Sequence, residues 1–75
     1  MTKIEFLSAF QDVLQRDDPV IDTDLLNEFE EWDSLSKMAT MAYFKGHFGI
    51  VISLDALGKL ETVADLIKLA GDNIK

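Results

Sequence analysis

The stretch EEWDSLSKM, residues 30–38, decides the fold, because an acidic segment ends there and an apolar segment with helical periodicity begins. Asp33 stands directly before Ser34 at this junction, and aspartate is among the residues preferred at the N-cap of a helix. We therefore expect a helix that begins at Ser34. The serine is either simply the first residue of that helix or an oxygen to which another group is attached.

This helix is expected to run to about His47, since Gly46 and Gly49 mark its end. One apolar stripe suits the core and carries Met41, Phe44 and Phe48. A second stripe is either a partly exposed contact surface or the edge of a broad core face, and it carries Leu35, Met38 and Ala42. The face expected to point outward carries Ser36, Ala39, Tyr43 and His47.

Residues 16–33 form a long connection after a first helix, which is expected over about 3–15 with Thr2 and Glu5 as a capping box. So long a connection within a small domain needs a reason. We expect its apolar side chains to pack over the helices while its acids face water, with a short helical turn over 23–26. These apolar residues are Val20, Ile21, Leu25, Leu26, Phe29 and Trp32.

Two shorter helices complete the predicted fold. Residues 48–52 lack a partner strand, so we expect an extended connector rather than a sheet. A short helix should follow over about 54–60, and a last helix over 63–70. The inward side chains of the short helix should be Leu54, Leu57 and Leu60. The sequence thus predicts a single all-α domain over 1–75, a four-helix bundle of three main helices and one short one.

Charge is distributed unevenly along the chain. The net charge is -7, and residues 1–33 carry ten acids and two bases, whereas residues 34–75 carry four acids and five bases. Nucleic acid is a poor partner for such a surface, because phosphate binding needs clustered Lys and Arg. The acidic segment either attracts a basic protein partner or serves only to keep the chain in solution.

The composition also bears on compartment and chemistry. There is no cysteine, so the chain has no thiol of its own. No apolar run is long enough to cross a membrane, and the first residues lack the apolar block of a signal peptide. We expect a cytoplasmic protein without membrane insertion. The sequence contains no calcium-loop motif and only one histidine, so no metal site is expected.

Catalysis by this chain alone is not expected. A serine nucleophile needs a nearby base, and His47 lies about 20 Å from Ser34 if both are in one helix. Attachment of an anionic group is better supported, because the free N–H groups and the dipole at a helix N-terminus favour a phosphate there. The tripeptide Asp33-Ser34-Leu35 alone does not decide between attachment and an ordinary helix start.

Across nearly its whole length the chain resembles the acyl carrier protein family, including peptidyl and D-alanyl carriers. The resemblance is carried by Asp33-Ser34-Leu35, by Phe48-Gly49-Ile50 and by Thr62-Val63-x-x-Leu66-Ile67, at the family's spacing. It implies that Ser34 receives 4'-phosphopantetheine from coenzyme A through a magnesium-dependent phosphopantetheinyl transferase. The thiol of that arm would carry acyl or aminoacyl groups as thioesters between loading and transferring enzymes.

The resemblance also implies a recognition patch of Asp33, Leu35 and Met38 on a monomeric carrier. Trp32 stands where carriers of fatty acid synthesis usually have glycine, and the helix after Ser34 lacks their acidity. The chain looks more like discrete carriers of specialised bacterial pathways. The alternatives are a peptidyl or D-alanyl carrier or, in another class, an unmodified helical interaction module with the same fold.

Overall fold

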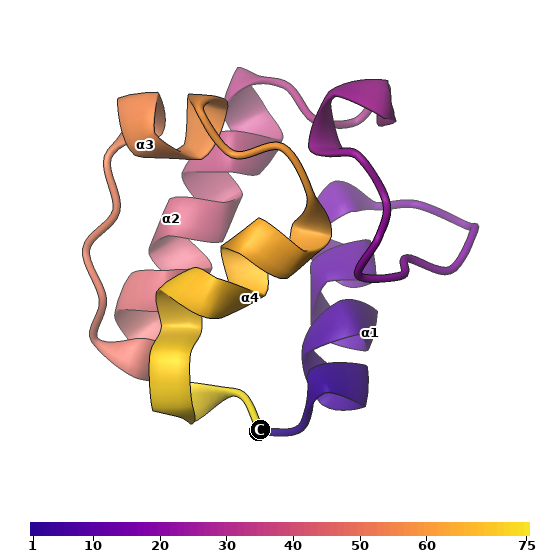
Figure 1. The fold of residues 1–75 in the computed structure, drawn as a ribbon. Coiled ribbons are helices and arrows are strands. Elements are labelled where there is room, and N and C mark those ends of the chain that lie inside the picture. Colours follow the sequence, from indigo (N-terminus) through magenta and orange to yellow (C-terminus); the bar gives the residue numbers. More distant parts are fainter.

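The computed structural model describes all 75 residues and contains four α-helices and no strand (Figure 1). The helices are α1 (Lys3–Leu14), α2 (Ser34–Phe48), α3 (Leu54–Gly58) and α4 (Val63–Ala70). Two 3-10 turns, η1 (Leu26–Glu28) and η2 (Gly71–Asn73), complete the secondary structure. The predicted all-α bundle of three main helices, one short helix and a long connection after the first is confirmed. The short helix ends two residues before its predicted limit.

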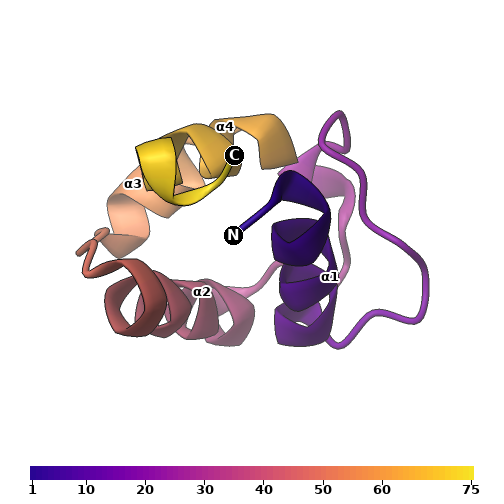
Figure 2. The same cartoon turned by 90° about the horizontal axis from the view of Figure 1, so that it is seen from below.

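The helices are arranged around a common centre (Figure 2), where their buried side chains form one hydrophobic core. At its centre the Phe6 ring stacks on Phe10, with centroids 6.0 Å apart, and meets Phe44 edge-on at 5.9 Å. Leu57 of α3 and Leu66 of α4 are fully buried against this cluster. The aromatic residues of α1 and α2 therefore hold the two long helices together.

Helix α1 begins and ends at well-defined caps. The Thr2 hydroxyl accepts from the Glu5 amide at 3.1 Å, and the Glu5 carboxylate accepts from the Thr2 amide at 2.8 Å. This reciprocal pair is the predicted capping box. At the other end Gln15 adopts φ 57°, a left-handed conformation that is unusual for a residue with a side chain. The helix therefore ends at Leu14, with Gln15 as its C-cap.

The long connection packs its side chains over the bundle only in part. Val20, Leu26, Phe29 and Trp32 are buried as predicted. Ile21 and Leu25 are exposed instead, at 54% and 43%. The backbone of Leu25 pairs with Thr62 in an isolated β-bridge, so this part of the connection is joined to the start of α4 through its backbone. The predicted turn over 23–26 is also displaced, since the 3-10 turn η1 begins only at Leu26.

The inner face of α2 differs from the predicted one. Its buried residues are Ser36, Thr40 and Phe44, so the prediction that Ser36 points outward is wrong. Burial of the two hydroxyls is tolerated because both are hydrogen-bonded, and the Thr40 hydroxyl donates to the Ser36 carbonyl at 2.8 Å. Tyr43 was also expected outward but is partly buried and packs edge-on against Phe6.

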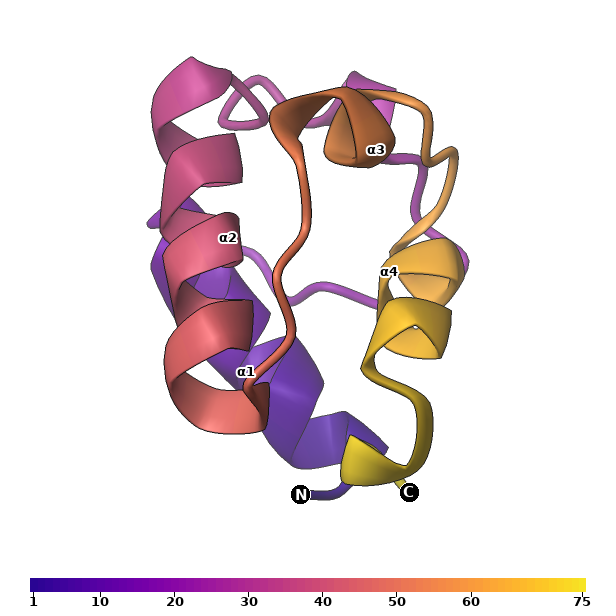
Figure 3. The ribbon, with the colours of Figure 1, turned by 90° about the vertical axis from the view of Figure 1, so that its left-hand side faces the viewer.

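The segment after α2 runs back alongside that helix to reach α3 (Figure 3). It is the predicted extended connector, and only Ile52 of it is buried. Leu54 at the start of α3 is 44% exposed, so the prediction that it points inward is wrong. Leu57 is the only residue of this five-residue helix that is fully buried, so Leu57 rather than Leu54 anchors α3 to the core.

The two termini lie side by side (Figure 3). The Lys3 amide donates to the Lys75 carbonyl at 3.1 Å, and the Lys75 amide donates to the Met1 carbonyl at 2.9 Å. No helix is both long and apolar enough to cross a membrane.

Candidate functional site

Asp33 caps α2 through a reciprocal pair of hydrogen bonds. Its backbone is extended, and its carboxylate accepts from the Ser36 amide at 2.9 Å. The Ser36 hydroxyl in turn accepts from the Asp33 amide at 2.9 Å. The hydrogen bond from the Ser36 amide holds the pKa of the Asp33 carboxyl below its usual value. The predicted N-cap is confirmed, and the helix begins at Ser34 as expected.

Ser34 is exposed in the first turn of α2. Neither its amide nor its hydroxyl makes a hydrogen bond within the protein, because the cap is formed by Asp33 and Ser36. The Ser34 hydroxyl is therefore free to react with a group from outside. Its amide is one of the unpaired N–H groups that make a helix N-terminus attractive to anions.

Ser36 has a structural part in this site that the sequence interpretation missed. It occupies the third helical position, where a capping box usually has Glu or Gln, so the usual sequence pattern does not indicate it. Its hydroxyl also donates to the Asp33 carbonyl at 3.1 Å. The spacing Asp33-x-x-Ser36 was the available signal, since serine can bond to a nearby backbone amide as glutamate does.

An exposed apolar surface adjoins Ser34. Leu35 is 77% exposed and Met38 is 58% exposed, and Ala42 continues the same side of α2. Of the two interpretations of this stripe, the partly exposed surface is confirmed and the broad core face is wrong. The structure thus brings Asp33, Leu35 and Met38 together around the serine.

Two open grooves flank α2. One, of about 480 Å³, lies between the end of α1 and the start of α2 and is lined by Val13, Gln15, Glu31, Asp33 and Leu35 among others. The second, of about 330 Å³, is lined by Met38, Met41, Ala42, Lys45, Val51 and Ile52. Both are open to solvent, so the fold encloses no deep cavity.

Other polar groups do not join the site. His47 lies in the last turn of α2, and its ring stacks on Tyr43 with centroids 4.1 Å apart. Ser34 is in the first turn of the same helix, so the two cannot form a nucleophile and base pair. No three side chains of the kinds that bind metals are grouped together.

A phosphate ester on the Ser34 oxygen fits these surroundings. The oxygen is exposed, and the free amide and the positive end of the α2 dipole favour an anion there. Of the two nearby carboxylates, that of Asp33 accepts from the Ser36 amide and that of Glu31 pairs with Arg16. Both carboxylates near the serine therefore already have a hydrogen-bond or ion-pair partner.

Comparison with known proteins agrees with this geometry. The family model described as a phosphopantetheine attachment site matches residues 5–70, which is most of the chain. No curated protein and no solved structure gave a significant match. Domains of the matched family bind 4'-phosphopantetheine covalently and carry groups rather than catalyse reactions. The chain therefore belongs to the phosphopantetheine attachment-site family and is a carrier, not an enzyme.

Proposed function

We propose that Ser34 is the attachment residue and that residues 1–75 work as one carrier domain for acyl or aminoacyl groups. The observation that carries this proposal is the free, exposed Ser34 hydroxyl at the start of α2, within the residues that match the family. The other hydroxyl in the first turn of α2, that of Ser36, is buried and bonded within the cap.

Attachment is a phosphoryl transfer to the serine. The Ser34 oxygen forms a new bond to the phosphorus that bears pantetheine in coenzyme A, and its proton passes to a base of the transferase. The bond from that phosphorus to the bridging oxygen breaks, and adenosine 3',5'-bisphosphate leaves. When attached, the arm supplies the thiol that a chain without cysteine lacks.

The chain's own residues favour this transfer in two ways. Asp33 holds the first turn of α2 through the Ser36 amide, so the serine is presented on a rigid element. The dipole and the free amide at the helix start favour the negative charge that the serine acquires.

Leu35 and Met38 are proposed, with Asp33, as the surface that the transferase and later partners recognise. Two large apolar side chains exposed next to a reactive residue are typical of a contact surface. The acidic segment 17–33 lies just before them and would speed the approach of basic partners.

A specialised pathway is proposed on the basis of the α2 surface. This helix has no acid in its first turn and has Lys45 and His47 in its last. Trp32, the other departure from carriers of fatty acid synthesis, is buried and therefore serves packing more than partner contact. The partners that distinguish such carriers would instead meet α2 and the acidic segment.

Incubation with coenzyme A and a broad-specificity transferase tests the proposal by intact mass. Wild type and Ser8→Ala should each gain one phosphopantetheine group, since Ser8 is an exposed serine within α1, far along the chain from the site. Ser34→Ala should gain none. Absence of any mass gain in wild type with several transferases would contradict the proposal and favour an unmodified interaction module. In that case a partner should bind wild type and Ser34→Ala equally.

A further inference from the structure

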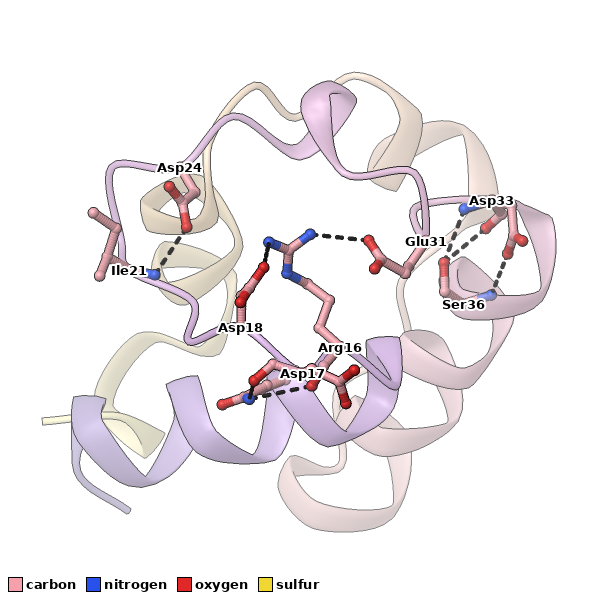
Figure 4. A network of polar contacts seen from close by, with 9 residues as sticks. Arg16, Asp17, Asp18, Ile21, Asp24, Glu31, Asp33 and Ser36 are labelled. Atoms are coloured by element: carbon pink, nitrogen blue, oxygen red, sulfur yellow. Dashed lines mark hydrogen bonds and ion pairs between the residues drawn. The ribbon is translucent and has the colours of Figure 1, made fainter.

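Arg16, two residues after the end of α1, faces the acidic turn that leads into α2 (Figure 4). We propose that Arg16 is a positioning residue for Ser34, because it holds Glu31 and Phe29 and thereby the turn from which α2 begins. This inference rests on the proposed attachment at Ser34.

The guanidinium of Arg16 makes three contacts with the long connection. Its Nη1 donates to the Glu31 carboxylate at 3.0 Å, and its Nη2 lies 3.8 Å from the Asp18 carboxylate. Its central carbon stands 4.6 Å from the centre of the Phe29 ring. A planar guanidinium can pair and stack at once, which an ammonium cannot do equally well.

Burial makes this contact stronger than an ordinary surface pair. The Arg16 side chain is only 21% exposed, and its Nε is buried without a hydrogen-bond partner. Charges that are partly removed from water interact more strongly and are screened less by salt. Loss of Arg16 would therefore leave the partly buried Glu31 carboxylate without its cation.

The backbone of Arg16 is itself fixed to α1. The Gln11 side-chain amide donates to the Arg16 carbonyl at 3.1 Å and to the Asp17 carbonyl at 3.2 Å. The Arg16 amide also donates to the Gln11 carbonyl at 3.1 Å. The guanidinium thus extends from a rigid base, so it can hold the connection in one place.

Short hydrogen bonds link the held residues to the start of α2. The Trp32 amide donates to the Phe29 carbonyl at 3.1 Å, and the Asp33 amide donates to the Glu31 carbonyl at 2.9 Å. Asp33 then caps the helix whose first residue is Ser34. A shift of Glu31 or Phe29 would pass directly to the cap and to the serine.

Arg16 is the one base between Lys3 and Lys37, so it also neutralises acidic charge near the site. Positioning and neutralisation make different predictions. If Arg16 positions Ser34, its removal lowers the rate of the transfer step. If Arg16 acts only through its charge, its removal alters how well the protein binds the transferase. The Lys3–Asp22 ion pair joins α1 to the same connection far from Ser34, and it provides a matched control for loss of one positive charge.

The experiment measures kcat and KM of phosphopantetheinyl transfer for wild type, Arg16→Met, Arg16→Lys, Glu31→Gln and Lys3→Met. Trp32 fluorescence is recorded on the same unmodified proteins, since it is the only tryptophan and lies next to Glu31. Arg16→Met and Glu31→Gln should lower kcat about ten-fold, as expected for a displaced reacting group, with little change in KM. Both should alter the Trp32 emission.

Arg16→Lys should be impaired as well, because it keeps the charge but loses the paired and stacked geometry. Arg16→Met combined with Glu31→Gln should be no slower than Arg16→Met alone, since both changes remove the same contact. Lys3→Met should keep the kcat and the fluorescence of wild type. Unfolding curves are recorded to check that each variant is folded. If Arg16→Met does not fold, the milder change Glu31→Gln still tests the inference.

Three results would overturn the inference. One is a wild-type kcat with unchanged Trp32 emission in Arg16→Met and Glu31→Gln. Another is a wild-type kcat in Arg16→Lys, which would mean that charge suffices. The third is an equal loss in Lys3→Met. If wild type itself is not modified, the proposed function fails, and the fluorescence still decides whether Arg16 holds the turn.

Discussion

The Trp32 ring meets the Phe10 ring edge-on, with centroids 5.7 Å apart and planes inclined at 69°. The indole is 8% exposed, and the Lys37 ammonium lies over its ring, 5.7 Å from the centre. This contact joins the last turn before α2 to the middle of α1. It confirms the prediction that Trp32 is packed.

Trp32→Ala should lower the free energy of unfolding by about 3 kcal/mol, because it removes a large buried aromatic side chain and leaves a cavity. Urea denaturation followed by circular dichroism measures the change. Ile4→Ala is the matched control, since Ile4 is 80% exposed and should change stability by less than about 0.5 kcal/mol. A loss of that small size in Trp32→Ala would mean that the indole contributes little packing.

Thr62→Ala should destabilise the fold by about 1 kcal/mol, the usual effect of losing a helix cap. The Thr62 hydroxyl accepts from the Asp65 amide at 3.2 Å at the start of α4. Thr23→Ala removes an exposed threonine that caps no helix and should be nearly neutral. Equal unfolding midpoints for the two variants would show that the cap does not stabilise α4.

Stability should fall in acid because the helix caps use carboxylates. Amide donors lower the pKa of Glu5, Asp33 and Asp65 in the folded state, the donors being Thr2, Ser36 and Thr62. The stabilisation is complete above the unfolded pKa of about 4 and is lost as the pH falls through the lowered folded pKa.

Thermal unfolding between about pH 7 and pH 2 tests this expectation. The melting temperature should be nearly constant at the upper end and should fall below about pH 4. Asp33→Asn keeps a capping side chain but cannot titrate there, so its melting temperature should fall less steeply in acid. If the melting temperature of Asp33→Asn falls in acid as steeply as that of wild type, Asp33 does not contribute to the acid sensitivity.

Leu35→Ser with Met38→Ser should weaken recognition by the transferase, because it removes the exposed apolar surface beside Ser34. We expect KM for the carrier to rise about ten-fold with stability nearly unchanged, as for loss of a central contact worth about 1.4 kcal/mol. Ile4→Ser removes an equally exposed apolar side chain from α1 and should leave KM unaltered. An unchanged KM in the double variant would place the recognition surface elsewhere.

The helix starts could be predicted because they depend on residues that are close together in the sequence. The caps at Thr2 and Asp33 follow from side chains that bond to backbone amides three residues away. Ser34 as the first residue of α2 followed from the Asp33 cap. Such local geometry depends little on the rest of the chain.

The inner face of α2 was not predictable in the same way. Ser36 and Thr40 are buried because hydrogen bonds within the helix start satisfy their hydroxyls, and a polarity pattern cannot show that. The contact of Arg16 with Glu31 spans 15 positions through an irregular connection, so no helical period or motif indicates it. These non-local polar contacts had to come from the structure.

Fragmentation of the modified wild-type protein tests the central claim most directly, because it locates the added group on a single residue. After treatment with coenzyme A and transferase, the phosphopantetheine mass should remain on the fragment that contains Ser34 and on no other serine. Attachment at another residue, such as Ser8 or Ser53, would contradict the assignment of Ser34 as the carrier site.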